Sequence, residues 1–327
     1  RSRQVWAAVQ PQSGTSSLIR YPDAPTRSYC LENCRLIKIL PLFYLAACHT
    51  MRNALTNPYK AMVVIPTYNA AAFLDRTLAS VAASIAHHCQ RTGTVPDHFL
   101  TVIVDDLSSD HTIAVAEAWR DRLRLMILNN DVRRGTSFSR NYGAAAAEAE
   151  VLFFLDHDDE FLPSHLHVCL QGLAQRPEAA YVRTGVELTV PVDPAWLPVI
   201  ASHLPITLGV RQDCHALLGG FNEDPAVRVL RCEDVLYANL LKGFFRGLRT
   251  DAVTARHYHM PGNALDNQLE RFQHPPGVVP PTPMKPEEIE ARQQVETSHR
   301  QQATRIGRRF TTLLRTMKSI PKAADRP

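Results

Sequence analysis

Val151-Leu-Phe-Phe-Leu155 runs directly into Asp156-His157-Asp158-Asp159-Glu160, so five apolar residues are followed at once by a cluster of acids. The apolar run predicts a fully buried β-strand. Carboxylates crowded at the end of such a strand repel one another and lose hydration, so a cation or a proton must offset their charge. A divalent metal held by hard oxygen ligands is the simplest interpretation. Helix capping is the alternative, because Pro163 shortly follows, but capping accounts for only one or two acids.

The same pattern occurs three times before this strand. Each time an apolar, strand-like run is followed by a polar loop and by a stretch with helical spacing of its apolar residues. The runs are Met62–Ile65, Phe99–Val104 and Leu123–Leu128, and the helices cover positions around 74–85, 114–119 and up to Ala149. Continuous apolar strands that alternate with helices predict an α/β fold, with a mostly parallel, Rossmann-like sheet flanked by helices on both faces.

Polar residues gather in the loops that follow these strands. In a parallel sheet the ligand site lies beyond the carboxyl ends of the strands, so residues far apart in sequence are expected to converge there. The residues concerned are Asn69, Asp105, Asp106, Arg140, Asn141 and Asp156 to Asp159.

The second half of the chain is less regular. Strand-like runs occur at 179–183, 187–190 and 254–259, and Gly219-Gly220-Phe221 indicates a turn. Glu233 and Asp234 begin a helical stretch, where acids are also favoured by the helix dipole alone. His257 and His259 are two residues apart, which places both on one face of an extended segment. They are either metal ligands or partly buried hydrogen-bonding side chains.

Composition limits the class of protein. The 327 residues are 45% apolar, enough for a large core, and the formal net charge is +4. From Lys285 onward there are ten Lys/Arg and five Asp/Glu, so the remainder is nearly neutral. That distribution argues against a nucleic-acid-binding protein. The seven scattered cysteines indicate reduced thiols in a cytoplasmic protein, and Cys30-x-x-x-Cys34 lacks the second pair that a zinc site needs.

The two ends of the chain are expected to lie outside the catalytic domain. Residues 1–57 are interpreted as an extension that is not a domain, without signal peptide or transmembrane helix, because the apolar run at 39–48 is too short. Residues 263–327 are predicted to be a Pro-rich linker and a basic helix with one apolar face. That helix could dock on its own protein, or it could make peripheral contact with the inner face of a membrane. Its apolar residues are Ile306, Phe310, Leu313, Leu314 and Met317.

Six motifs together resemble one family, the family-two inverting glycosyltransferases. They occur in the family's order and with its approximate spacing between residues 60 and 260. The motifs are Val64-Ile-Pro-Thr-Tyr-Asn69, Val104-Asp-Asp-x-Ser-x-Asp-x-Thr112, Gly135-x-x-x-Ser-Arg-Asn-x-Gly143, Phe154-Leu-Asp-x-Asp-Asp159, Gly219-Gly-Phe-x-Glu223 and Glu233-Asp234.

The resemblance implies a GT-A fold, with a nucleotide-sugar-binding half at 58–160 and an acceptor-binding half at 161–262. It also implies transfer of a hexose-type sugar from a nucleotide sugar, most often a UDP-sugar, to a hydroxyl of a glycan, lipid or protein acceptor, with inversion. Mn²⁺ or Mg²⁺ is the implied cofactor. A nucleotidyltransferase is the alternative enzyme, although Pro66-Thr-Tyr-Asn69 lacks its Gly-rich phosphate loop. An inactive binding or scaffold protein is the other alternative, and the retained acids argue against it.

The resemblance also implies roles for individual residues. The nucleotide site would contain Pro66, Thr67, Asn69, Asp105, Asp106, Arg140, Asn141 and Asp156. Asp156 and Asp158 would hold the metal-diphosphate group, with His257 or His259 as a further ligand, and Asp159 would orient the loop. Asp234 would be the catalytic base that deprotonates the acceptor, with Glu233 as its supporting neighbour. Leu107 replaces the family's usual glycine, so we expect its turn to tilt differently, with more effect on base selectivity than on catalysis.

Overall fold

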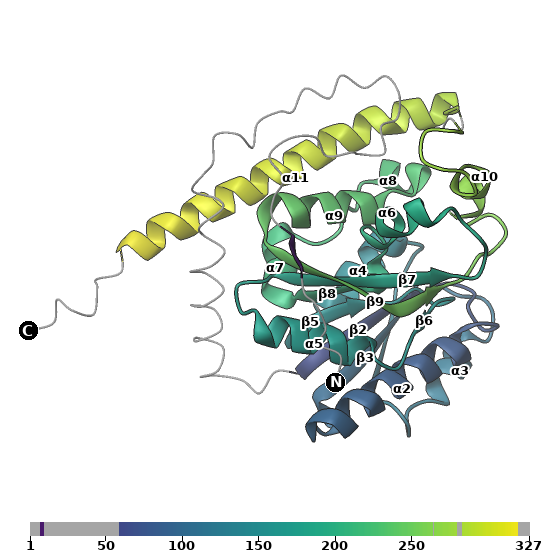
Figure 1. Ribbon diagram of the computed structural model, residues 1–327, viewed down its shortest axis with the longest axis vertical. Helices are drawn as coiled ribbons and strands as arrows, with labels where there is room; N and C mark the ends of the chain where they lie inside the picture. The colour runs from purple at the N-terminus through teal and green to yellow at the C-terminus, as the bar shows by residue number, and fades with distance from the viewer. Residues whose placement is uncertain (1–6, 10–58, 264, 280–282, 320–327) are drawn as a thin grey trace, which may run out of the picture.

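The computed structural model describes residues 7–9, 59–263, 265–279 and 283–319 of the chain. Helices and strands alternate through the first half and become less regular in the second (Figure 1). The strands are β1 (Ala7–Val9), β2 (Tyr59–Thr67), β3 (Phe99–Asp105), β4 (Leu125–Asn129), β5 (Ala149–Phe154), β6 (Glu160–Phe161), β7 (Tyr181–Leu188), β8 (Leu208–Arg211) and β9 (Gly247–His257). The α-helices are α2 (Leu74–Thr92), α3 (Thr112–Glu117), α4 (Thr136–Ala144), α5 (His165–Gln175), α6 (Leu197–Ala201), α7 (Gln212–Leu218), α8 (Pro225–Leu230), α9 (Glu233–Phe244), α10 (Leu269–Phe272) and α11 (Pro286–Ser319). Short 3₁₀ turns are η1 (Pro96–His98), η2 (Pro194–Trp196), η3 (Pro205–Thr207) and η4 (Asp266–Gln268).

All described strands belong to one sheet, in the order β1-β9-β7-β8-β5-β2-β3-β4, with β6 paired to β9. The four strands predicted from the first half are present, and β5, β2, β3 and β4 are parallel neighbours. β8 is antiparallel to both β5 and β7, while β7 and β9 are again parallel neighbours, so the complete sheet is mixed. The fold is α/β, as predicted.

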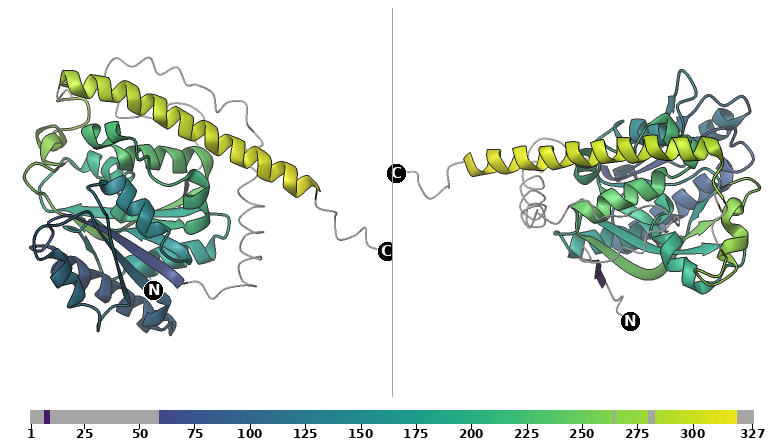
Figure 2. Two further views of the ribbon diagram at one scale, coloured as in Figure 1. Left: turned by 180° about the vertical axis from the view of Figure 1, so that it is seen from behind. Right: turned by 90° about the horizontal axis from the view of Figure 1, so that it is seen from above.

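Two cores cover the two faces of the sheet (Figures 1 and 2). One core packs α2, α3 and α5 against the sheet, and the other packs α4, α7, α9 and α11. Gly143 allows α4 to lie close to the strands, because a Cβ there would be 2.5 Å from Val64 Cγ1 and 2.9 Å from Val104 Cγ2. This close approach sets the position of Arg140, one turn earlier on the same helix.

The C-terminal helix α11 is longer than predicted and crosses one side of the domain (Figure 2). Ile306 and Phe310 are almost completely buried, and Phe310 stacks on Phe244 with ring centroids 5.9 Å apart. The apolar face is therefore used for docking on the protein itself at these positions, which was one of the two predicted alternatives. This docking leaves the membrane alternative without support. The side chains of Leu314 and Met317 are not among those that the structure describes.

Three further expectations differ from the structure. The runs at 179–183 and 187–190 form a single strand, β7, and the Ala-rich helix α4 ends at Ala144 because β5 begins at Ala149. The stretch after Pro261 is not merely a linker, since Leu265 and Phe272 are buried against Trp196. The domain boundaries themselves stay a prediction.

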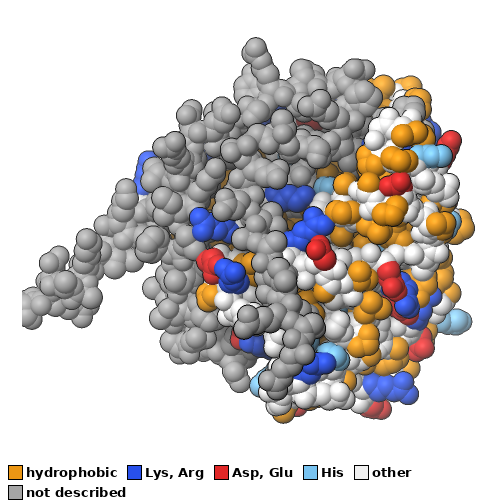
Figure 3. Space-filling model, in the orientation of Figure 1, with side chains coloured by type: hydrophobic (Ala, Val, Ile, Leu, Met, Phe, Trp, Pro, Cys, Tyr) orange, Lys and Arg blue, Asp and Glu red, His pale blue; other side chains and the backbone are white. Residues whose placement is uncertain are grey.

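Several expectations concern residues outside the described ranges. Cys30, Cys34, Cys48 and the apolar run at 39–48 belong to this group. Within the described part of the chain, Cys89, Cys169, Cys214 and Cys232 form no disulfide, and no helix is long and apolar enough to cross a membrane. On the face shown in Figure 3, basic and acidic side chains lie interspersed, as expected for a nearly neutral body.

Candidate active site

The ends of the parallel strands bring the predicted nucleotide residues together. Thr67 and Asp105 are register partners in β2 and β3, and Thr67 Oγ1 donates to Asp105 Oδ1 at 3.3 Å. Asp105 also accepts from the backbone and hydroxyl of Ser108, at 2.9 and 2.5 Å. Asn69 Oδ1 accepts from the backbone nitrogen of Ser109 at 2.9 Å. The loops after β2 and β3 are therefore tied to one another at this edge of the sheet.

Asp106 fixes the loop that follows β4. Its carboxylate accepts from Asn130 Nδ2 at 2.8 Å and from the backbone nitrogens of Arg134 and Gly135 at 2.7 and 2.9 Å. Burial alone would raise the pKa of Asp106, but these hydrogen bonds lower it below its usual value. Arg133 lies against the Tyr68 ring, 3.2 Å from its centroid, so the 130–135 loop also contacts the first loop. Asp106 thus organises the backbone around the site.

Leu107 is held in the left-handed region of the backbone, with φ of +66°. That conformation suits glycine, and it explains why the family's pattern has glycine here. The Leu107 side chain is 51% exposed, so little burial offsets the strain. The predicted tilt of the turn stays a prediction.

Arg140 connects the acid loop to the front of α9. Its side chain is 2% exposed, with Nη2 2.5 Å from Asp156 Oδ1 and Nη1 3.3 Å from Glu233 Oε1. Burial disfavours the charge, yet the two carboxylates outweigh it and raise the pKa of Arg140. Burial would also raise the pKa of Asp156, but Arg140 lowers it. Asp156 and Glu233, far apart in sequence, therefore share one buried guanidinium.

Asn141, the next residue, contacts the segment that follows α7. Its Nδ2 donates to the Phe221 carbonyl at 2.9 Å and to Glu223 Oε1 at 2.6 Å, and its Oδ1 accepts from Phe221 N at 2.8 Å. Gly220 has φ of +74°, and a Cβ there would lie 2.2 Å from Asn141 Oδ1. Asn141 thus holds the predicted glycine turn, while its contact with the nucleotide stays a prediction.

Helix α2 supports the backbone of the acid loop. Arg76 Nη2 donates to the Asp158 carbonyl at 2.7 Å, and Thr77 Oγ1 lies 2.8 and 2.9 Å from the carbonyls of His157 and Asp159. His157 Nδ1 lies 3.2 Å from the Pro66 carbonyl, which joins the acid loop to the first loop. The loop therefore has a fixed shape, and the described residues provide no hydrogen bond to the Asp158 carboxylate.

Asp159 and His257 form a buried pair, with Oδ2 and Nδ1 2.8 Å apart. Burial raises the pKa of Asp159 to about 6. Burial would lower the pKa of His257, but Asp159 raises it to about 9. The Tyr258 backbone nitrogen also donates to Asp159 at 2.9 Å, so Asp159 fixes the loop to the end of β9. His257 Nε2 is left facing away from this pair.

His259 lies apart from this pair. The strand β9 ends at His257, so the two-residue alternation does not extend to His259. His259 Nε2 lies 2.7 Å from Asp266 Oδ1. Its role as a metal ligand stays a prediction, and the described residues contain no cluster of three His, Cys, Asp or Glu side chains arranged for a metal.

Asp234 begins α9 beside Glu233. Burial, followed by the negative charge of Glu233, raises the pKa of Asp234 to about 7. Arg140 and Asp156 also act on this carboxyl, with opposite signs, so Asp234 belongs to the same electrostatic site as the acid loop. A carboxyl with this pKa can accept a proton near neutral pH.

Comparison of the sequence with known proteins indicates its family. Residues 62–215 match the family described as Glycosyl transferase family 2. This match supports the assignment of the chain to glycosyltransferase family 2. Among its relatives, validoxylamine A glucosyltransferase of Streptomyces hygroscopicus subsp. limoneus is 42% identical over 95 residues, which are 29% of this chain and 19% of that protein. Poly(ribitol-phosphate) beta-N-acetylglucosaminyltransferase TarS of Staphylococcus aureus is 27% identical over 149 residues, 40% of this chain and 25% of the relative. The chain thus matches a quarter or less of the length of these two relatives.

Solved structures confirm the GT-A fold of this family 2 member. Residues 1–349 of S. aureus TarS in complex with UDP-GlcNAc superpose with a TM-score of 0.55 at 18% identity, over 73% of this chain and 66% of the other. A mannosyltransferase from Pyrobaculum calidifontis, in complex with GDP-Man and Mn²⁺, gives a TM-score of 0.50 at 16% identity, over 87% and 85%. At these identities the similarity concerns the fold.

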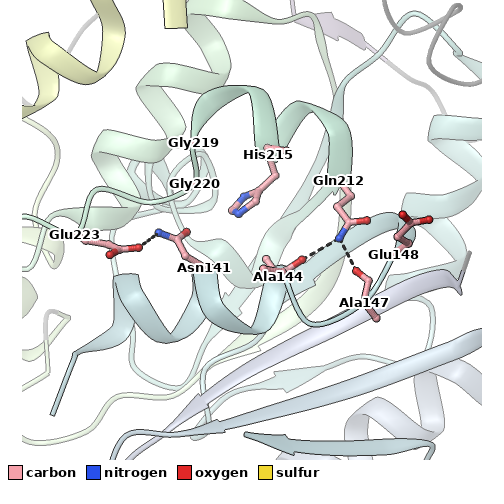
Figure 4. A pocket seen from close by; sticks show the side chains of 11 residues that line it. Asn141, Ala144, Ala147, Glu148, Gln212, His215, Gly219, Gly220 and Glu223 are labelled. Carbon is pink, nitrogen blue, oxygen red and sulfur yellow. Dashed lines mark hydrogen bonds between the residues drawn. The ribbon is translucent and has the colours of Figure 1, made fainter. Parts of the chain in front are cut away.

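A pocket of about 450 Å³ lies between α4 and α7, away from the acids of this family 2 site (Figure 4). Asn141 and Glu223 lie at one end, and Glu148 and Gln212 at the other. Gln212 closes the loop between α4 and β5, because Nε2 donates to the carbonyls of Ala144 and Ala147 at 2.9 and 2.7 Å.

Sequence reasoning missed Arg76 and Thr77, because neither residue belongs to a motif. The only available signal was their place in the first helix after β2, in a fold whose loops meet at one edge. The Asp159–His257 pairing was also missed, although both residues had been singled out separately.

Proposed function

We propose that this chain is a metal-dependent, inverting glycosyltransferase of the hexosyltransferase type. It transfers a sugar from a nucleotide-diphosphate sugar, a UDP-sugar by preference, to a hydroxyl of a glycan, lipid or protein acceptor. The observation that carries the proposal is Arg140, which is buried between Asp156 and Glu233. Arg140 joins the loop proposed to bind the diphosphate to α9, whose first turn contains the proposed base.

The donor site is proposed at the ends of β2, β3 and β5. Thr67, Asn69 and Asp105 form one hydrogen-bonded set, and Asp106 fixes the adjoining loop. Backbone and side-chain groups held in this way suit the base and ribose, because a binding group that is already ordered loses little entropy when the ligand arrives. The TarS structure contains UDP-GlcNAc, which supports a uridine nucleotide.

The residues present fit a divalent cation that is shared with the donor. Mg²⁺ is usually held by one or two carboxylates together with substrate phosphates, so a complete three-ligand protein site is not required. Asp158 has a carboxylate without a hydrogen bond from the described residues, and Asp156 lies beside it. His257 has the pattern of a metal-ligating histidine, because Nδ1 faces a carboxylate and Nε2 is free. Such a cation would stabilise the charge that develops on the diphosphate leaving group.

Asp234 is proposed as the base that removes the proton from the acceptor hydroxyl. Inversion requires one displacement, in which the acceptor oxygen bonds to the anomeric carbon as the bond to the diphosphate breaks. The proton passes to the Asp234 carboxylate. Glu233 keeps the pKa of Asp234 high, while Arg140 neutralises Glu233 and limits that effect.

Thermal shift of the full chain with UDP, GDP and their sugars, with and without Mn²⁺, tests this function. We expect UDP to raise the melting temperature only with the metal, and to do so through Asp158. Asp158→Asn should remove the metal-dependent shift, whereas Asp131→Asn, which changes an exposed acid paired with Arg134, should keep it. Equal shifts with and without metal would contradict the metal assignment. The absence of any nucleotide effect would favour a binding protein without transferase activity.

A further inference from the structure

Three cations face one another in the second half of the sheet. Arg183 on β7 and Arg249 on β9 are register partners, so their side chains start from the same face of the sheet. Lys242 on α9 belongs to the same cluster, because its Nζ donates to Ser202 Oγ at 3.3 Å and Arg183 Nη1 reaches the carbonyl of the preceding Ala201 at 3.5 Å. Burial first, and then the charges of Arg183 and Arg249, lower the pKa of Lys242 to about 8. Like charges in directly opposed positions destabilise a sheet, so folding alone does not favour this arrangement.

The described residues compensate the cluster only in part: burial lowers the pKa of Arg183 to about 10, and Tyr181 and then the Asp234 carboxylate oppose that shift. Arg183 is 5% exposed, and its Nη1 donates to the Leu204 carbonyl at 2.8 Å and to Thr207 Oγ1 at 3.2 Å. Its Nη2 is buried without a hydrogen-bond partner. Lys242 Nζ donates to Ser202 Oγ at 3.3 Å. Within the described ranges, neither Arg183 nor Lys242 forms an ion pair with a carboxylate.

Arg249 completes the cluster at the surface. Its Nε lies 4.0 Å from Asp251 Oδ1, and the Asp251 side chain is 99% exposed, so this ion pair contributes little. The Arg249 side chain is itself partly exposed. The cluster therefore has a buried floor at Arg183 and an accessible rim at Arg249 and Lys242.

Helix capping accounts for only part of the arrangement. Arg183 Nη1 reaches carbonyls at the end of α6, and Lys242 stands in the last turn of α9, where a cation is favoured. Capping explains neither the unpaired Nη2 of Arg183 nor the placement of Arg249 opposite it. A buried donor without a partner is unfavourable, so a ligand that accepts a hydrogen bond from it would be stabilised.

We propose that Arg183, Lys242 and Arg249 bind a phosphate group carried by the acceptor. This inference rests on the proposed function, because it assigns the acceptor class to the half of the fold that contains Asp234. A phosphate oxyanion suits guanidinium and ammonium donors, which bind it through charge-assisted hydrogen bonds. Asp234 and Lys242 are eight residues apart on one helix, or about 12 Å along its axis. An acceptor could therefore present its hydroxyl to Asp234 while its phosphate reaches the cluster.

Titration calorimetry of the full chain with glycerol 3-phosphate, glycerol and inorganic phosphate tests the proposal. The protein is first saturated with UDP and Mg²⁺, so that phosphate cannot occupy the donor site. We expect glycerol 3-phosphate to bind more tightly than inorganic phosphate, and glycerol not to bind. Lys242→Gln and Arg249→Gln should each weaken binding of glycerol 3-phosphate about tenfold, which is the usual effect of losing a charged hydrogen bond.

The matched control is Arg246→Gln, because Arg246 is an exposed arginine next to the start of β9. It should change the affinity for glycerol 3-phosphate less than twofold, and all three variants should bind UDP as the wild type does. Equal weakening by the control, or no binding of glycerol 3-phosphate, would overturn the proposal. So would inorganic phosphate binding as tightly as the ester, since it would indicate a site for free anions. Absence of UDP binding by the wild-type chain would instead contradict the proposed function.

Discussion

Arg140 and Glu233 lie 93 positions apart in the sequence, yet Arg140 Nη1 is 3.3 Å from Glu233 Oε1. The same guanidinium contacts Asp156 through its other terminal nitrogen. One buried cation therefore fixes the acid loop and the start of α9 relative to each other. Because the proposed base follows Glu233 directly, this relationship determines how the two halves of the site meet.

Replacing Arg140 should damage both stability and transfer. Arg140→Gln leaves Asp156 and Glu233 without their cation, and removing one partner of a buried ion pair costs about 3 kcal/mol or more. We expect urea denaturation to show that loss, and sugar transfer to fall below detection. Arg134→Gln is the control, because its ion pair with Asp131 is exposed and contributes little to stability. Similar losses in both variants would show that the burial of Arg140 has no special role.

The pH dependence of transfer should follow the ionisation of Asp234. With its pKa raised to about 7, the carboxylate that accepts a proton is formed only as the pH rises through that value. We therefore expect kcat/KM to increase with pH up to a plateau above about 8. Asp234→Asn should lower transfer by about 10²–10⁴-fold and leave UDP binding within threefold.

The pH profile also separates Asp234 from its neighbour. Glu233→Gln removes the negative charge that keeps the pKa of Asp234 high, so the acidic limb should move to lower pH while transfer persists. An unchanged acidic limb in Glu233→Gln, or normal transfer by Asp234→Asn, would refute the assignment of the base.

The pairing of His257 with Asp159 should appear in the stability of the metal-free protein. The pKa of His257 rises from 6.5 to about 9 on folding, so its contribution is complete below pH 6.5 and is lost as the pH rises through 9. Burial also raises the pKa of Asp159 to about 6, which offsets part of that contribution above this pH. His257→Gln should therefore be less stable than the wild type at pH 6, and this difference should shrink towards pH 9.

His259→Gln is the matched control for that comparison. His259 pairs with Asp266, which is partly exposed, so its loss should cost less than about 1 kcal/mol at any pH. Urea denaturation in the presence of EDTA measures both variants without contribution from a metal. A difference of the same size for both histidines would mean that the buried pair is not the source of the effect.

The sequence predicts those parts of the fold that have a local pattern. The four parallel strands and their helices follow from periodicity, and parallel connectivity is sufficient to bring Thr67, Asp105 and Asp156 to one edge. The bonds from Arg76 and Thr77 to the acid loop cross about 80 positions and have no periodic pattern. The docking of Ile306 and Phe310 has no local pattern either. An amphipathic helix indicates that its apolar face will be buried, but it does not indicate which surface of the protein covers that face. The antiparallel insertion of β8 is a third case, since strand order depends on tertiary packing.

Leu107 offers a test in which sequence and backbone conformation disagree. With φ of +66° and a mostly exposed side chain, leucine is strained here and gains little from burial. Leu107→Gly should relieve about 1 kcal/mol of strain, partly offset by the greater freedom of glycine in the unfolded chain. We therefore expect the glycine variant to be as stable as the wild type or slightly more stable in urea denaturation. Leu107→Ala keeps the Cβ and the strain, so it should not be stabilised. A glycine variant that is clearly less stable than the alanine variant would show that the strain relieved at this φ is smaller than the cost of the freedom that glycine adds to the unfolded chain.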